Sequence, residues 1–205
     1  MLRRISIFNN NSSDLAVTRL RPYGRMMIHT LSELAARLGK NQRLLGLDVG
    51  TKTVGLAVAD PGLIVASPIG TLKRTKFTQD ARELGRTIRD YGIGGLVVGL
   101  PLNMDGTEGP RAESVRAFAN NLLERSDLLG WEAEIAFWDE RLSTSAVERF
   151  MIGEADMTRK RRDEVVDKMA AAYILQGALD MLANQRRLAA EADKDERDED
   201  YDDRD

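Results

Sequence analysis

Residues 44–62, LLGLDVGTKTVGLAVADPG, decide the fold that this 205-residue sequence predicts. Two apolar runs, 44–48 and 54–59, are typical of adjacent strands, and the residues between them are typical of a tight turn. Asp48 ends the first run, which is otherwise apolar enough to be buried. A lone ionised carboxylate in apolar surroundings is costly unless it is paired, hydrogen-bonded or bound to a metal ion. The rest of the chain has to supply that partner.

The pattern downstream predicts a mixed sheet. Residues 63–69 extend the first two strands into an antiparallel meander, and apolar strands then alternate with helices of amphipathic spacing. We therefore expect an α/β fold, a five-stranded mixed sheet with helices on both faces. The further elements predicted are a helix at 78–91, a strand at 95–100, a helix at 111–125, a strand at 131–138, and helices at 144–152 and 163–187.

The two ends of the chain differ in composition from the body at 44–188. Residues 1–43 form a predicted extension, partly disordered, with a short helix near 31–38 that starts at a capping box led by Thr30. Residues 191–205 carry ten acids and three bases, a net −7, so the first 190 residues carry +4 of the total −3. Too few apolar residues lie in 189–205 to fold, and we expect a disordered acidic tail. It serves either as a solvating tail, which we favour, or as an arm that competes with nucleic acid.

Composition excludes several kinds of chemistry. The chain has no Cys, which removes disulfides, thiolate metal sites and cysteine nucleophiles. Its one histidine, His29, lies in the extension, where we expect it at the surface. No apolar run reaches the ~20 residues that span a membrane, so we expect a cytoplasmic protein with no membrane partner. The arginine-rich residues 1–26 are compatible with a transit peptide, but we favour a poorly ordered extension or translation from Met26 or Met27.

Three acids fall where a metal site is expected. Asp48 and Glu140 follow predicted strands, and ligands bind at the carboxyl ends of parallel strands in such sheets. Asp167 lies on the apolar stripe of the last helix, about one turn from its start. Taken alone, Asp167 is better explained as an acid that complements the helix dipole. Together, the three carboxylates suit a hard divalent ion, Mg²⁺ or Mn²⁺, that acts on a phosphodiester.

Four sequence blocks make the resemblance specific. LLGLDVGTKTVGLAVAD, VVGLPLNMDGTEGPRAESVRAFANNL, WDERLSTSAVERF and VVDKMAAAYILQ are similar, in this order and spacing, to the motifs of the YqgF family, also called RuvX. The resemblance covers about 44–182. It implies an RNase H-like fold, Asp48, Glu140 and Asp167 as metal-binding catalytic acids, and a nuclease that matures the 5′ end of 16S ribosomal RNA. The sequence departs from the resolvases at one place. Resolvases carry an acid at the end of the fourth strand, where this chain has Val98-Gly99-Leu100-Pro101.

Several polar residues near these acids are candidates for contact with the phosphates of structured RNA or branched DNA, and each has a simpler explanation. Thr51 and Lys52 also fit a hairpin turn, and Asn103 lies in a loop whose Asp105-Gly106 is an ordinary turn. Arg141 either anchors a phosphate or pairs with a neighbouring acid. A basic run before the last helix either tracks a nucleic-acid backbone or is a solvated face; it consists of Arg159, Lys160, Arg161 and Arg162.

Three functions compete at this stage. The first is a metal-dependent endonuclease for pre-16S rRNA, with a Holliday junction as the alternative substrate. The second is an ATP-using phosphotransferase of the actin and sugar-kinase class, which shares the DxGT turn but needs two such domains. The third is a non-catalytic nucleic-acid-binding module. We favour the nuclease, as a monomer or a homodimer.

Overall fold

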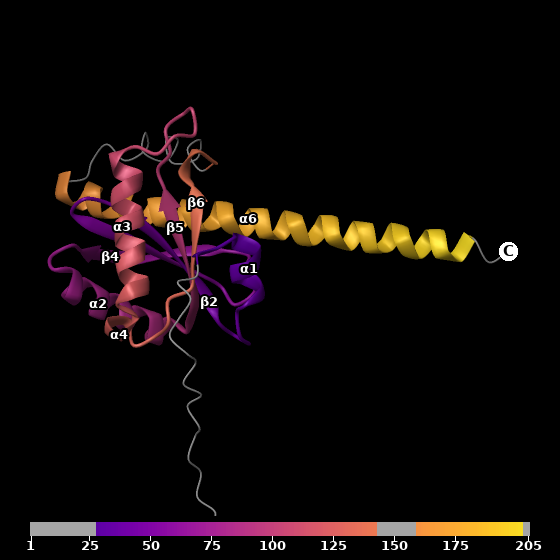
Figure 1. Ribbon diagram of the computed structural model, residues 1–205, viewed down its shortest axis with the longest axis horizontal. Coiled ribbons are helices and arrows are strands. Elements are labelled where there is room, and N and C mark those ends of the chain that lie inside the picture. The colour runs from indigo at the N-terminus through magenta and orange to yellow at the C-terminus, as the bar shows by residue number, and fades with distance from the viewer. Residues whose placement is uncertain (1–27, 143–158, 203–205) are drawn as a thin grey trace, which may run out of the picture.

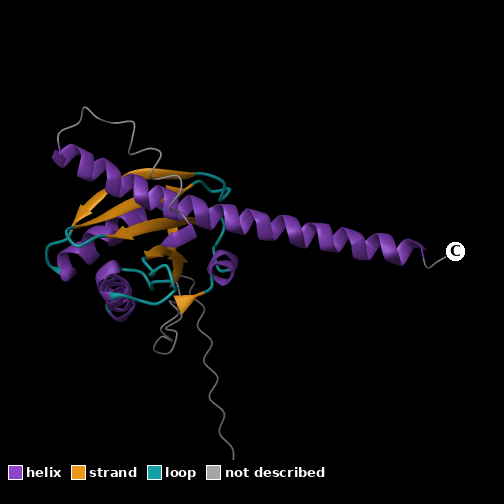
Figure 2. Ribbon diagram, turned by 90° about the horizontal axis from the view of Figure 1, so that it is seen from above, coloured by secondary structure: helices purple, strands orange, loops and turns teal. Residues whose placement is uncertain are grey.

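The computed structural model describes residues 28–142 and 159–202, and the side chains of 28–141 and 169–194. A single mixed sheet forms its centre, with helices on both faces (Figures 1 and 2). The described elements, in chain order, are β1 (Ile28–His29), α1 (Leu31–Ala36), β2 (Arg43–Val49), β3 (Thr53–Ala59), β4 (Ala66–Lys73), α2 (Phe77–Tyr91), β5 (Ile93–Leu100), α3 (Pro110–Glu124), α4 (Ser126–Leu129), β6 (Ile135–Asp139), a 3₁₀ turn (Glu140–Leu142) and α6 (Arg159–Asp202).

The sheet has the order β1-β6-β5-β2-β3-β4. Strands β2, β5 and β6 are parallel neighbours, while β2, β3 and β4 form the antiparallel meander. The predicted mixed sheet of RNase H-like topology is confirmed. The sheet has six strands where the sequence predicts five, because Ile28 and His29 pair in parallel with Ile135 and Ala136 at its edge.

Alternation along the strands divides the core into two layers. Leu45, Leu47 and Val49 of β2 face one layer, which α2, α3 and α4 cover. Leu44 of β2 faces the other layer, which α1 and α6 cover. Glycine permits the close packing of α6, because a Cβ on Gly46 would lie 2.7 Å from the Cβ of Leu175. The face of β2 that carries Asp48 is therefore the face that α6 crosses.

Two strands begin later than predicted. β4 begins at Ala66, because the carboxylate of Asp60 accepts hydrogen bonds from the backbone N–H groups of Gly62, Ile64 and Val65 and holds the preceding residues in a turn. β6 begins at Ile135 where the sequence predicts 131. The predicted helix at 144–152 lies outside the described residues.

Residues 189–202, which the sequence predicts to be disordered, are helical in the structure. Helix α6 continues through Asp202 and extends away from the sheet as a single rod (Figure 1). Residues 183–194 are exposed, so tertiary packing does not explain the helix. This segment is rich in Ala, Glu, Lys and Arg and has neither Gly nor Pro, and such a composition has high helix propensity. No helix within 28–142 or 159–202 is both long and apolar enough to span a bilayer.

Candidate active site

Asp48 and Glu140 lie at the same edge of the sheet. Asp48 is the next-to-last residue of β2, and Glu140 directly follows β6, with the end of β5 between the two strands. The register places Gly99 of β5 beside Trp138 of β6. Because side chains alternate along a strand, Asp48, Gly99 and Glu140 all belong to the face that α6 covers.

Gly99 leaves the space that the Glu140 side chain uses. A Cβ at position 99 would lie 2.7 Å from Oε1 of Glu140 and 2.5 Å from Cδ1 of Ile174 in α6. The Glu140 carboxylate therefore lies directly over the backbone of β5, on the side of Asp48. Any larger residue at 99 displaces the carboxylate or the isoleucine.

The pKa of Glu140 is raised from its ordinary value of 4.5 to about 7. Burial is the main cause, and the negative charge of Asp48 is the second. The nearby Arg111 guanidinium lowers the pKa, but by less than these two effects raise it. Two carboxylates that repel each other in a half-buried site are an arrangement that a divalent cation relieves.

Asp139 and Arg141 fix the turn that carries Glu140. The Asp139 carboxylate accepts hydrogen bonds from Nη2 of Arg141 at 2.6 Å and from Nε at 3.0 Å, and its pKa is lowered chiefly by these bonds. Nη1 of Arg141 also donates to the carbonyl oxygen of Met104 at 3.3 Å. The explanation that Arg141 pairs with a neighbouring acid is therefore confirmed, and contact with a phosphate stays a prediction.

The other described candidates for phosphate contact also lie at this edge, exposed in its loops. Thr51 and Lys52 form the turn between β2 and β3, which the bond from Gly50 N–H to Thr53 O closes at 2.9 Å. Asn103 belongs to the loop between β5 and α3, and its side chain donates to Oγ1 of Thr107 at 2.9 Å. Turn formation explains these residues in the structure, and their contact with nucleic acid stays a prediction.

The third predicted acid is described only in its main chain. Asp167 lies in α6 seven residues before Ile174, about two helical turns, and so on the same side of the helix as the isoleucine that touches Gly99. The side chains of Asp167 and of the basic run 159–162 lie outside the described residues. Among the side chains of 28–141 and 169–194, no three His, Cys, Asp or Glu residues are grouped to hold a metal ion.

The described part of the site nevertheless fits a hard divalent cation. Its donors are carboxylate oxygens, the ligands that Mg²⁺ and Mn²⁺ prefer, and they come from a rigid sheet. Burial and mutual repulsion at Glu140 favour binding of a positive charge at the edge. That Asp48 and Glu140 bind such an ion stays a prediction.

Sequence reasoning missed two residues of the site. In the sequence Gly99 is only part of a stretch that lacks an acid, because the space it leaves for Glu140 depends on the register between β5 and β6. Arg111 follows Pro110 at the start of α3, near Glu140. The available signal was that α3 begins directly after the 101–109 loop, so its first residues return to the edge that carries the acids.

The fold is of the RNase H-like class, and the comparisons with similar proteins identify the chain as a nuclease. Residues 42–181 match the family model RuvX, described as Holliday junction resolvase, and the chain belongs to this family. It is 69% identical over 173 residues to a protein of Rhodospirillum centenum named "Putative pre-16S rRNA nuclease", covering 84% of this chain and 91% of the relative. A protein of Paramagnetospirillum magneticum with the same name is 59% identical over 155 residues, covering 76% and 96%.

A similar solved structure is the yeast mitochondrial Holliday junction resolvase. It has 9% sequence identity and a TM-score of 0.42, and the match covers 78% of this chain and 89% of that one. A likeness at this level carries no argument about the function of this chain.

Proposed function

We propose that the chain is a metal-dependent endonuclease that hydrolyses phosphodiester bonds in pre-16S ribosomal RNA, in the cytoplasm. The observation that carries the proposal is the pair of carboxylates, Asp48 and Glu140, which lie on one face at the carboxyl ends of β2 and β6. Burial and the neighbouring Asp48 raise the pKa of Glu140, and pKa values perturbed in this way are typical of functional sites.

Asp48, Glu140 and Asp167 would hold Mg²⁺ or Mn²⁺. When bound, such ions stabilise the charge on the phosphodiester and lower the pKa of an attacking water. Other residues of the chain hold the Glu140 carboxylate in position. Gly99 gives the Glu140 carboxylate its place over β5, and the ion pair between Asp139 and Arg141 orients the turn that carries it.

The names of the relatives support RNA as the substrate. The family description supports a four-way DNA junction as the second candidate. The departure of Gly99 from the resolvase pattern favours the RNA, because the position at which resolvases carry an acid is here filled by the Glu140 side chain.

The test is a cleavage assay on two labelled substrates, an RNA that spans the immature 5′ end of 16S ribosomal RNA and a four-way DNA junction. Each is incubated with Mg²⁺ or Mn²⁺ and with wild type, Asp48→Asn or Glu140→Gln. Glu134→Gln is the matched control, because Glu134 precedes the same strand that Glu140 follows.

The proposal expects the RNA to be cut by wild type and Glu134→Gln, and not by the two site variants or in a chelator. If only the DNA junction is cut, the proposed active site stands and the proposed substrate changes from RNA to branched DNA. Equal behaviour of wild type and site variants on both substrates contradicts the proposal and favours a binding module.

A further inference from the structure

Two connections that are far apart in sequence meet beside Asp48. The turn 50–52 joins β2 to β3, and residues 74–76 join β4 to α2. The backbone N–H of Arg74 donates to the carbonyl oxygen of Lys52 at 2.8 Å, and Lys73 pairs with Thr53 across the strands. Lys52, Lys73, Arg74 and Lys76 are thereby gathered in one place, which we call the basic rim.

Arg74 acts as the structural member of the basic rim. Its Nη1 donates to the carbonyl oxygen of Gly50 at 2.5 Å, two residues after Asp48. Its guanidinium also lies 5.4 Å from the centroid of the Phe118 ring in α3. These contacts fix the two connections to each other and to the body, so the basic rim is rigid relative to the site.

The three lysines of the basic rim are exposed. Within the described residues, no acidic side chain forms an ion pair with Lys52, Lys73 or Lys76. Asp80, the acid closest in sequence to Lys73 and Lys76, is buried and accepts hydrogen bonds from the backbone N–H of Thr75 at 3.0 Å and from its hydroxyl at 2.9 Å. The basic rim therefore presents positive charge to solvent at the edge that carries the acids.

The placement defines a path across the site. The basic rim lies on the β4 side of Asp48, while Arg141 and the 101–109 loop lie on the β6 side. A nucleic-acid strand that crosses this edge from the 101–109 loop, past Asp48 and Glu140, would continue over the basic rim. Lysine contacts to phosphates position a nucleic acid and carry no sequence information.

We propose that the basic rim binds the RNA phosphate backbone on one side of the scissile bond, which rests on the proposed function. Three lysine contacts to phosphate contribute a salt-dependent, sequence-independent part of the affinity. Their loss weakens binding without touching the groups that carry out hydrolysis.

The test compares wild type with Lys52→Gln/Lys73→Gln/Lys76→Gln on the labelled 16S precursor RNA and on the four-way DNA junction. The control, Lys40→Gln/Arg86→Gln/Lys194→Gln, removes the same charge at exposed positions outside the basic rim. Binding is measured from 50 to 300 mM KCl, with Ca²⁺ in place of Mg²⁺, and cleavage is measured separately in Mg²⁺.

For the variant of the basic rim, the slope of log affinity against log salt should fall by roughly 2, since each phosphate contact contributes about 0.7–0.9. Affinity near 0.1 M salt should fall on the order of 100-fold, and cleavage at RNA concentrations below saturation should fall with it. The control should bind like wild type.

The proposal that the basic rim binds RNA is overturned if the salt slope of the variant equals that of wild type, or if the control loses as much affinity as the variant. A similar loss on the four-way DNA junction, with none on RNA, overturns RNA as its partner. If wild type cuts neither substrate, the proposed function fails, whereas the salt slopes still decide whether the basic rim binds a nucleic-acid backbone.

Discussion

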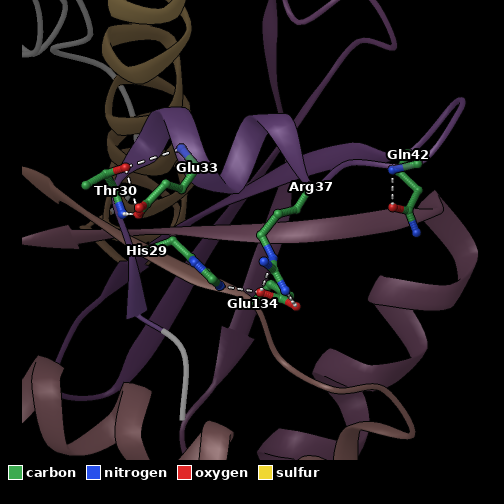
Figure 3. A network of polar contacts seen from close by, with 7 residues as sticks. His29, Thr30, Glu33, Arg37, Gln42 and Glu134 are labelled. Atoms are coloured by element: carbon green, nitrogen blue, oxygen red, sulfur yellow. Dashed lines mark hydrogen bonds and ion pairs between the residues drawn. The ribbon is translucent and has the colours of Figure 1, made fainter. Parts of the chain in front are cut away.

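Strand β6 has a glutamate next to each end, and the two lie in opposite electrostatic surroundings. Glu134 precedes the strand and lies between two basic side chains, a contact shown in Figure 3. Its carboxylate contacts Nε2 of His29 and accepts hydrogen bonds from Nε of Arg37 at 3.1 Å and from Nη2 at 3.3 Å. Glu140 follows the strand and lies near Asp48, where its pKa is raised to about 7.

The difference distinguishes Glu134, which we expect to contribute to stability, from Glu140, which we propose as a metal ligand. Glu134 joins β1 and α1 to β6, so its charge is used within the fold. Burial and Asp48 disfavour the charge on Glu140, so its ionised form gains most from a ligand that arrives from outside. This comparison makes opposite predictions for equal substitutions at the two ends of one strand.

The largest expected effect is on catalysis at the Glu140 end. Asp48→Asn or Glu140→Gln should lower the RNA cleavage rate at least about 1,000-fold, which is roughly 4 kcal/mol of transition-state stabilisation. Both variants should fold, because an amide of the same shape relieves the repulsion between the two carboxylates. Glu134→Gln should cleave at the wild-type rate. An equal loss of activity in all three variants would contradict the different roles of Glu134 and Glu140.

A methyl group at Gly99 tests how tightly the site is positioned. Gly99→Ala should lower cleavage about 10- to 100-fold, because the added Cβ displaces the Glu140 carboxylate. The free energy of unfolding should fall by less than about 1.5 kcal/mol, since the clashing atoms are the ends of flexible side chains. Gly70→Ala, which meets no atom within 4 Å, is the control. Equal cleavage by the two alanine variants would contradict the role of Gly99.

A substitution at Glu134, before the start of β6, should change stability and not catalysis. Glu134→Gln should lower the free energy of unfolding by about 1–3 kcal/mol, because it removes the charged partner of Arg37 and of the buried His29. Urea denaturation of the variant and of wild type measures this loss. A variant as stable as wild type would show that the contact in Figure 3 contributes nothing to the fold.

The raised pKa of Glu140 predicts how pH acts on the metal-free protein. The folded protein keeps a proton on Glu140 from its ordinary pKa of 4.5 up to about 7. The stability that this proton contributes is fully present below pH 4.5 and is lost as pH rises through 7. The melting temperature of wild type should therefore fall relative to that of Glu140→Gln between pH 5 and pH 8. Parallel pH profiles would show that the pKa is not raised.

The smallest effect is expected far from both glutamates. Ending the chain after residue 190 removes only the distal part of α6, whose described side chains are exposed. The free energy of unfolding should change by less than about 0.5 kcal/mol, and cleavage should not change. Calorimetry and the RNA assay check both. A large loss in either would assign this segment a role in the body.

The local pattern of the sequence predicted the strands that carry Asp48 and Glu140 and the edge at which they meet. It did not predict what depends on pairing between distant residues. His29, expected at the surface, is buried because its short strand pairs with β6 and its side chain contacts a residue 105 positions away. The space above Gly99 likewise depends on the register of three strands. The acidic composition of the tail predicts disorder, whereas its helix propensity favours the helix that the structure has through Asp202.

The most direct test of the central claim is the effect of Mg²⁺ or Mn²⁺ on melting temperature in wild type, Glu140→Gln and Glu134→Gln at pH 8. A ligand that binds only the folded state raises the melting temperature, by an amount set by its affinity. We expect the metal to stabilise wild type and Glu134→Gln by several degrees and to leave Glu140→Gln unchanged. An equal shift in all three proteins, or none in wild type, would contradict a metal site at the carboxyl edge of the sheet.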